Sequence, residues 1–435
     1  MIRRLTTTLA IASVLVATLA GAAAASATVI WDVKTVGDSA QGWLSIERGV
    51  AAWDSFDGIQ VWRSGIAKTA IVPGTSRAIV SDVVVSNGQV FWLETVGDYW
   101  SGRGIVHVWR PGEGRARVIA SRPHIQRGSL RVAGRRLCWS EGSGSAPFSR
   151  WRTRTLDDKA VQQIPKLADG AADLSLAENV LAFGMLDWTR RVAALPLGMG
   201  GADGRSSLPA PNVIARAPDA MYLTGTLSAA GDRVAWAART KVDTSTVMTW
   251  NLGKSAPSTL GTDTVPGQAI AVSPSRLAWA RGADTGIQTI MTQGPGSSAA
   301  AAVAAYPSPL ECYGLRSSGG RLIWFASSDQ TSTLYSWGSS DPEPSAIPVS
   351  LSHGTAELSE DIVAVVGETF AGGDTKVYIA RPVGEIPTPA PRVPSRPLWD
   401  VLVQAVTSPT GVAWVVGLTL AVGVLLVINL IVDRR

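Results

Sequence analysis

Short apolar stretches, each preceded by one or two turn residues, recur along the chain. The clearest reads Gly-Asp-Arg-Val-Ala-Trp at 231–236, and Ser-Arg-Leu-Ala-Trp at 275–279 is a close copy. Side chains alternate between the two faces of a strand, so Val234 and Trp236 point one way and Ala235 points the other. The pattern therefore predicts β-strands buried on both faces, with a large side chain on one face and a small one on the other.

The last residue of this phrase marks a repeat. The marker positions are Trp53, Trp92, Trp139, Phe183, Trp236, Trp279, Trp324 and Val365. A spacing of about 40 to 50 residues between units of short strands is typical of propeller blades. A further apolar stretch precedes each marker and others follow it, which predicts four antiparallel strands per unit, a to d from the axis outward. We expect an all-β, eight-bladed β-propeller; seven blades, with one degenerate copy absorbed elsewhere, is the alternative.

The phrase at 231–236 and the Val-x-x-Trp strand at 247–250 resemble the repeats of TolB-like and WD40-like bacterial propellers. This resemblance extends over residues 28–383. It implies a blade fold, and it suggests interaction with a partner more than chemistry.

The eighth unit lacks an apolar stretch for its outer strand before the prolines begin at Pro387. Residues 29–33, at the other end of the repeat region, supply one. We expect this segment to pair with the last blade, because that pairing closes the ring and removes two open sheet edges.

The start of the chain has the pattern of a secretory signal peptide over residues 1–27. Arg3 and Arg4 precede an apolar run at 9–20, and a small-residue stretch ends in Ala-Ser-Ala at 25–27. These are the basic, apolar and cleavage-site regions of such a peptide.

The end of the chain predicts a single membrane anchor. Residues 411–432 are almost entirely apolar, long enough to cross a bilayer, and followed by a basic tail at 433–435. A proline-rich stalk is expected at 384–398 and a juxtamembrane segment at 399–410. The small residues Ala413, Gly417 and Ala421 favour close packing of two such helices and so predict a weak homodimer. The expected location is the cell membrane, with the propeller outside the cytoplasm.

Charge and cysteine content narrow the function classes. The formal charge is +5 over 435 residues, and basic residues are scattered among acidic ones, which argues against a nucleic-acid partner. The two cysteines, Cys138 and Cys312, fall four units apart in a ring of eight. We expect two free thiols, because a disulfide needs Cα atoms within about 7 Å.

No catalytic residue, metal site or cofactor is predicted. The three histidines, His107, His124 and His353, lie in different units and suggest neither a metal cluster nor a base–nucleophile pair. The leading hypothesis is a non-enzymatic binding or scaffolding module for an envelope protein or a glycan. The alternative is a surface glycoside hydrolase or lyase acting on polysaccharide, which would gather acidic residues at one mouth of the channel.

Aromatic residues mark a candidate partner-binding surface. They fall in the predicted hairpin tips between strands b and c of units eight, one, two, three and four, which are contiguous in a closed ring. The candidates are Phe56, Tyr99, Trp100, Phe148, Trp188 and Phe370. Exposed aromatics clustered on a rim are typical of interaction surfaces.

Overall fold

The computed structural model describes residues 28–386 with internal gaps. Outside the described residues lie 40–41, 76–78, 98–101, 143–149, 158–160, 165–170, 186–190, 198–211, 216–220, 223–225, 242–243, 263–269, 283–286, 295–296, 298, 329–330 and 369–374. The predicted signal peptide, the transmembrane segment with its tail, and the stalk from residue 387 onward also lie outside them. Within the described part, no helix is long and apolar enough to span a membrane.

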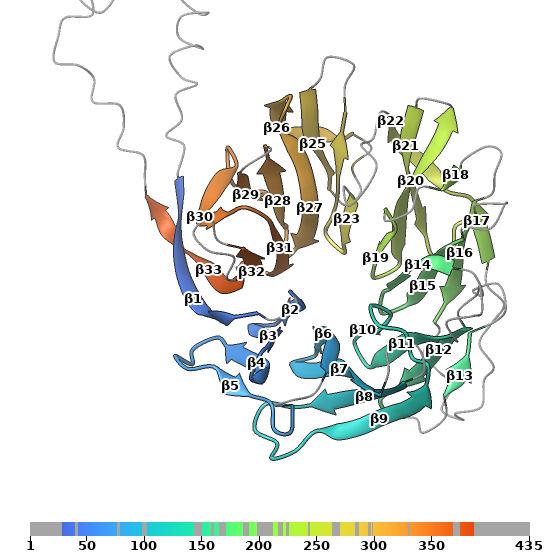
Figure 1. The fold of residues 1–435 in the computed structure, drawn as a ribbon. Helices are drawn as coiled ribbons and strands as arrows, with labels where there is room; N and C mark the ends of the chain where they lie inside the picture. Colours follow the sequence, from blue (N-terminus) through green and yellow to red (C-terminus); the bar gives the residue numbers. More distant parts are fainter. Residues whose placement is uncertain are drawn as a thin grey trace, which may run out of the picture. The chain divides into compact units, whose positions relative to one another are not determined.

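Residues 29–385 form one compact unit in which eight sheets are arranged in a ring (Figure 1). Each sheet is one blade, and its strands a to d follow one another in sequence in seven of the eight. The eight sheets confirm the predicted blade number and exclude the seven-bladed alternative.

Blades 1 to 4 are regular four-stranded sheets. Blade 1 contains β2 (Leu44–Glu47), β3 (Val50–Ser55), β4 (Gly58–Arg63) and β5 (Ala70–Ile71). Blade 2 contains β6 (Ile79–Ser86), β7 (Gln89–Val96), β8 (Arg103–Trp109) and β9 (Arg117–Pro123). Blade 3 contains β10 (Arg131–Ala133), β11 (Arg136–Glu141), β12 (Arg150–Thr155) and β13 (Gln162–Gln163). Blade 4 contains β14 (Ala171–Leu176), β15 (Val180–Met185), β16 (Val192–Pro196) and β17 (Asn212–Ala215).

Blade 5 differs because its inner strand is split in two. It contains β18 (Met221–Tyr222), β19 (Ser228–Ala230), β20 (Arg233–Lys241), β21 (Thr244–Asn251) and β22 (Ser258–Thr262), and both β18 and β19 pair with β20. Blade 6 contains β23 (Ile270–Ser273), β24 (Arg276–Arg281), β25 (Ile287–Gln293) and β26 (Ala301–Pro307). Blade 7 contains β27 (Glu311–Ser318), β28 (Arg321–Ser327), β29 (Ser332–Gly338) and β30 (Ser345–Leu351).

Blade 8 joins the two ends of the propeller. Its strands are β31 (Gly354–Ser359), β32 (Ile362–Glu368), β33 (Thr375–Ile386) and β1 (Thr28–Asp38), and β1 is the outer strand, beside β33 (Figure 1). The expected ring closure is therefore confirmed. β33 continues to Ile386, three residues into the range expected for the stalk.

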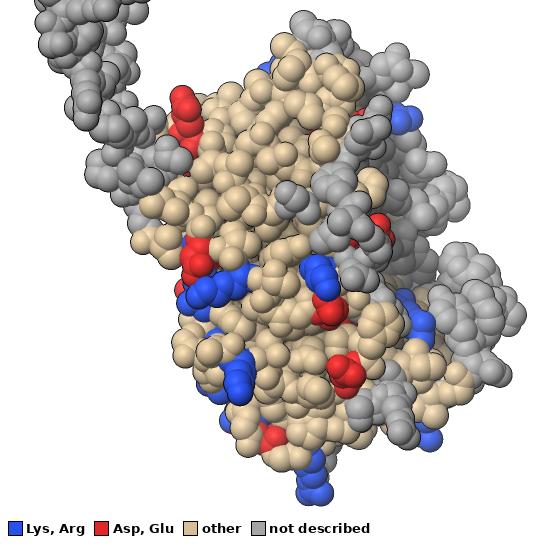
Figure 2. All heavy atoms as spheres, turned by 60° about the vertical axis from the view of Figure 1, so that its left-hand side comes forward, with Lys and Arg blue, Asp and Glu red and all other residues tan. Residues whose placement is uncertain are grey.

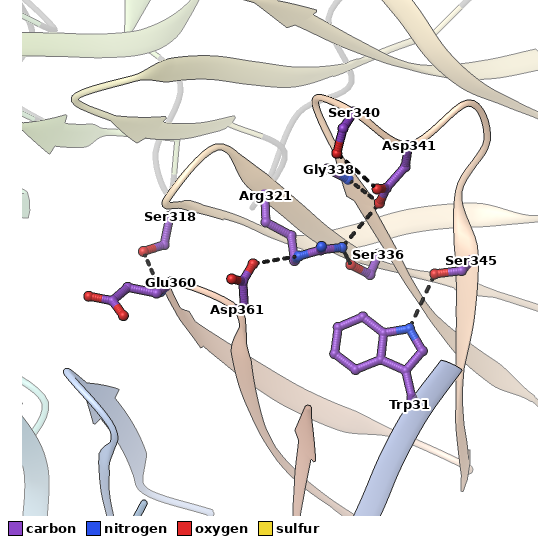
Figure 3. A network of polar contacts seen from close by, with 10 residues as sticks. All are labelled: Trp31, Ser318, Arg321, Ser336, Gly338, Ser340, Asp341, Ser345, Glu360 and Asp361. Carbon is purple, nitrogen blue, oxygen red and sulfur yellow. Dashed lines mark hydrogen bonds and ion pairs between the residues drawn. The ribbon is translucent and has the colours of Figure 1, made fainter. Parts of the chain in front are cut away.

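Polar contacts around Arg321 tie this closing strand to blade 7 (Figure 3). The Arg321 guanidinium donates to Asp341 Oδ2 and to Asp361 Oδ1, each at 3.1 Å. It also lies over the Trp31 ring of β1, 5.6 Å from the ring centroid. The indole nitrogen of Trp31 donates to Ser345 Oγ at 3.2 Å. Residues from β1 and from blades 7 and 8 thus meet in one network, which we call the Arg321 cluster.

Adjacent blades pack a large side chain against small ones. Trp279 of blade 6 lies in a buried cluster with Ala235 and Ala237 of blade 5. Trp236 packs in the same way on Ala182 of blade 4. All eight marker residues are buried, which confirms that they form the core between blades.

Serine hydroxyls also join neighbouring blades near their inner strands. In four seams a hydroxyl of one blade accepts a hydrogen bond from a backbone N–H of the next. The pairs are Ser45 with Val85 (2.9 Å), Ser228 with Val272 (3.2 Å), Ser318 with Glu360 (3.0 Å) and Ser359 with Arg48 (2.8 Å). Such bonds satisfy backbone donors that have no partner within their own sheet.

The two cysteines confirm the predicted register. Cys138 lies in β11 of blade 3 and Cys312 in β27 of blade 7; both are buried and neither is in a disulfide. Burial raises the pKa of each thiol to about 12, so both stay protonated near neutral pH.

Candidate functional site

The inner strands of seven blades surround an axial channel. Each of these strands is the terminal strand of its sheet and so has one edge without a partner in that sheet. The channel has a volume of about 700 Å³. Its lining includes Val84, Arg131, Ser175, Ser228, Ala271, Ser317 and Glu357, one from each of blades 2 to 8.

Charges of both signs line this channel. Arg316 Nε lies 3.1 Å from Glu357 Oε1, across the seam between blades 7 and 8. Arg131 Nη1 donates to the carbonyl oxygens of Gly128 and Leu130, both at 2.9 Å, so its guanidinium is held against the wall. A channel with fixed charges of both signs and small hydroxyl side chains suits a polar, extended ligand better than an apolar one.

Asp82 is a buried carboxylate behind the channel wall, and no motif in the sequence identified it. Only 2% of the residue is exposed, and it adopts a φ of 53°, a left-handed conformation that is uncommon for residues other than glycine. Its Oδ2 accepts the N–H of Gly128 at 2.9 Å, which fixes the lining segment 126–129. Burial raises the pKa of Asp82 to about 6, although the charge of Arg131 and the hydrogen bond from Gly128 act against that rise. The only sign of this residue's role in the sequence is a charged side chain within the valine-rich strand β6.

The histidines do not come together. His107 Nε2, in β8, lies 2.7 Å from Glu94 Oε2, and the imidazole stacks on Trp92 with ring centroids 4.9 Å apart. Burial lowers the pKa of His107, while the charge and hydrogen bond of Glu94 raise it. His353 lines a separate cavity of about 600 Å³ between blades 6 and 7, beside Glu311 and Tyr313. Among the described residues no group of three or more side chains is arranged to bind a metal ion.

The predicted aromatic arc is only partly within the described residues. Phe56 lies in the turn between β3 and β4 and is 83% exposed, as expected for a hairpin tip. The other five candidates, Tyr99, Trp100, Phe148, Trp188 and Phe370, lie outside the described residues. The arc as a partner-binding surface stays a prediction.

The circumference beside the closing strand carries a second hollow. A groove of about 660 Å³ lies between β1, β33 and the segment 65–69. Arg381 stacks on Trp62 in this groove, 4.5 Å from the ring centroid. On the face shown in Figure 2, which brings this side forward, positive and negative side chains are intermixed.

Comparison with known proteins reveals similarity in fold. No protein-family model matches the chain, and no curated protein matches it. Among solved structures, dipeptidyl peptidase 4 of Porphyromonas gingivalis is similar, with 11% identity and a TM-score of 0.54 over 80% of this chain and 58% of that one. The β-propeller domain of the Trilobed protease from Pyrococcus furiosus has 11% identity and a TM-score of 0.46 over 72% and 95%. TolB from Acinetobacter baumannii has 10% identity and a TM-score of 0.35 over 56% and 58%.

These comparisons bear on two predictions. The expected TolB-like β-propeller is confirmed as a fold, because the chain forms eight sheets in a ring and is similar in fold to dipeptidyl peptidase 4. The prediction of a non-enzymatic binding or scaffolding module is contradicted by the similarity to dipeptidyl peptidase 4, a peptidase that shares this fold. The chain spans about half the length of two other similar structures, 50% of a prolyl endopeptidase and 53% of a puromycin-hydrolysing peptidase of Mycobacterium tuberculosis.

Proposed function

We propose that this propeller is the substrate-admitting part of a peptide-hydrolysing enzyme. The observation that carries the proposal is the axial channel, which the unpaired edges of the inner strands line. The similarity in fold to dipeptidyl peptidase 4 is in keeping with it.

The channel suits an extended peptide. A strand edge offers N–H and C=O groups at regular spacing, and extended peptides bind such edges through main-chain hydrogen bonds. A volume of about 700 Å³ is within the usual range for small-ligand sites, so it accommodates a short unfolded segment and excludes a folded domain. The Arg316–Glu357 pair and the held Arg131 offer both charges to the side chains and ends of a peptide.

In this proposal, groups other than the described residues of the propeller cleave the bond. A hydrolase needs a nucleophile or activated water with a base in hydrogen-bond reach. In the described part of the chain, the imidazole of His107 is engaged with Glu94, and His124 and His353 belong to the β9–β10 and β30–β31 connections. The propeller would select and deliver the peptide to a catalytic unit.

Two predicted terminal segments support a location outside the cytoplasm for this activity. A signal peptide at 1–27 and an anchoring helix at 411–432 would hold the propeller on the outer face of the cell membrane. Its substrates would then be peptides outside the cytoplasm, and the stripe of Ala413, Gly417 and Ala421 would pair two anchors.

A block of the channel tests the proposal. Intact cells that make the full chain are given a mixture of dye-quenched peptides, and hydrolysis is followed by fluorescence. Removal of the protein should lower hydrolysis. Ser175→Trp, which fills the channel, should fail to restore it, whereas Val118→Trp, which adds the same side chain on the outer strand β9, should restore it in full.

Two results would contradict the proposal. Hydrolysis that is unchanged by removal of the protein would reject the peptidase role. Full restoration by a Ser175→Trp protein with an unchanged melting temperature would reject the channel as the route.

A further inference from the structure

Positive charge is concentrated in about one eighth of the sequence. Residues 101–157 contain twelve arginines and three acidic residues, Glu113, Glu141 and Asp157, whereas the whole chain has a formal charge of only +5. The rest of the protein is therefore net acidic. This segment forms the outer two strands of blade 2 and most of blade 3.

Strand β12 of blade 3 directs three arginines toward blade 2. Arg150, Arg152 and Arg154 alternate with Trp151 and Thr153, so the arginines share one face. The same face of the neighbouring strand β11 presents Leu137 and Trp139, opposite Arg154 and Arg152. Those two apolar residues pack in a cluster with Val106 and Val108 of blade 2. The arginine face of β12 therefore faces blade 2.

Strand β9 of blade 2 directs two arginines toward blade 3. Arg117 lies opposite Val108, which packs against blade 3. Arg122 lies opposite Gly104, on the same face, where an added Cβ would touch Ile125 of that interface. The two arginines are five residues apart and would point to opposite faces of a regular strand. A β-bulge beside Val106 inserts one extra residue in β9 between them, so both point to the same face.

One contact shows that the two rows meet. Arg154 Nη1 donates to the carbonyl oxygen of Ile119, which lies between Arg117 and Arg122 in β9. Both flanking arginines are then within about 10 Å of that contact along the strand. We call the set Arg117, Arg122, Arg150, Arg152 and Arg154 the arginine seam.

The arginine seam has much more positive than negative charge. Glu141 is the one carboxylate that the strand register places on these facing surfaces, and its Oε2 lies 2.9 Å from Arg152 Nε. Arg117, Arg122 and Arg150 are exposed and form no ion pair with another described residue. Facing guanidinium groups repel one another, so an anion between them would be stabilised.

We propose that the arginine seam binds a linear polymer that carries phosphate groups. Guanidinium groups bind phosphate oxygens bidentately, and alternate residues of β12 repeat every ~6.7 Å, which suits a ligand with regularly spaced charges. Nucleic acid fits less well, because single strands need exposed aromatic platforms for their bases. Both tryptophans next to the arginines, Trp139 and Trp151, are buried. The seam is built from strands c and d, so it is separate from the channel, which strands a line.

Anisotropy of labelled long-chain polyphosphate measures this binding to the full-length protein in detergent. The triple variant Arg117→Gln, Arg122→Gln, Arg150→Gln removes the exposed charges and leaves Arg152 and Arg154 in their contacts. We expect its affinity to fall at least tenfold, and the slope of log K against log salt to fall by roughly two to three.

A matched triple variant controls for net charge. The variant Arg103→Gln, Arg110→Gln, Arg115→Gln removes three exposed arginines of blade 2. They lie in the β8–β9 turn or on the face of β8 that points away from blade 3. Its affinity should stay within about twofold of the wild-type value. An equal loss in both variants would overturn the proposal in favour of diffuse attraction.

Binding measurements with other polymers give the remaining results that would decide the proposal. No binding of polyphosphate at low salt by the folded wild-type protein would overturn the proposal. So would tighter binding of polyglutamate or of a single-stranded oligothymidine through the same three arginines. Unchanged melting temperatures show that each variant is folded.

Discussion

Two seams of the ring solve the same packing problem in opposite ways. Between blades 5 and 6, the small Ala235 and Ala237 face the large Trp279. Between blades 7 and 8, the large Ile323 and Phe325 face Val365, which occupies the marker position of its blade. At the first seam the large side chain comes from the marker position of the later blade, and at the second it comes from the earlier blade. A marker position that lacks tryptophan is therefore still filled by its neighbour. Volume is shared across a seam, and neither blade fixes it alone.

The second seam also depends on contacts that are far apart in sequence. Trp31 of β1 packs in the same cluster as Phe325 and Val365, and the Arg321 cluster joins it by polar contacts (Figure 3). Blades 5 and 6 are formed from consecutive hairpins. The comparison therefore predicts that damage at the 7–8 seam affects the whole ring, whereas damage elsewhere is more local.

Removal of β1 should have the largest effect. Deletion of residues 28–36 exposes the edge of β33 and removes the buried Trp31 side chain, so we expect the free energy of unfolding to fall by at least about 4 kcal/mol. Thermal and urea unfolding of the purified protein measure it. Ile30→Ala, a neighbouring and partly exposed residue, should cost about 0.5 kcal/mol or less. An unchanged melting temperature after the deletion would show that closure does not stabilise the ring.

Loss of the Arg321 side chain should rank second. Arg321→Ala leaves Asp341, whose side chain is 4% exposed, without its counter-ion, and such a loss costs about 3–5 kcal/mol. Arg276 is the matched control, because it also begins strand b of its blade but bonds Thr292 and stacks on Trp337 without a carboxylate. We expect Arg276→Ala to cost about 1 kcal/mol in urea unfolding. An equal loss of unfolding free energy in the two variants would show that the Arg321 cluster has no special role in stability.

Exchange of large and small side chains tests the shared volume directly. Val365→Trp should overpack the seam and cost about 1–3 kcal/mol, and Phe325→Ala should leave a cavity and cost about 3–5 kcal/mol. The double variant should cost less than the sum by at least about 1 kcal/mol, which is a favourable coupling in a double-mutant cycle. Ala237→Phe with Trp279→Val repeats the test at the 5–6 seam. Strictly additive costs at both seams would reject shared volume.

Acid should affect a third seam, between blades 2 and 3, by the smallest amount. The pKa of Asp82 is about 6 in the folded protein against an ordinary value of 3.8, so the folded state binds the proton more tightly. The free energy of unfolding should therefore fall as pH rises from about 4 to about 6, by about 1–2 kcal/mol. Asp82→Asn should lack this part of the pH dependence in urea unfolding at pH 4.5 and 7. An identical pH dependence in the two proteins would contradict it.

The blades were predictable because their signal is local. Period-two alternation around each marker identifies strand b, and the leftover stretch at 29–33 could only complete the last blade. Details that depend on neighbouring segments of the fold were not predictable. Examples are the split inner strand of blade 5 and the left-handed conformation of Asp82. The arginine seam was not predicted either, because its two rows face each other only as a result of the β-bulge in β9 and of the packing between blades 2 and 3.

The functional prediction failed for a different reason. The repeated phrase encodes how blades pack, and the Trp279–Ala237 contact would look the same in a binding module and in an enzyme. The residues that line the channel come mainly from the inner strands of seven different blades, and no short motif connects them. Backbone edges, which carry much of the proposed peptide contact, leave no trace in side-chain patterns.

The position of β1 has a consequence for the order in which the protein is made. β1 is synthesised before all the blades, but β33, its partner, follows about 340 residues later. At about 5–20 residues per second, the strand waits roughly 20 to 70 seconds for its partner. During this time an apolar strand with an open edge is exposed to other chains, and only Asp32, Lys34 and Asp38 on it discourage wrong pairing. Ring closure is thus the last step of assembly, and a holding chaperone that binds the early strand would raise the yield of closed rings.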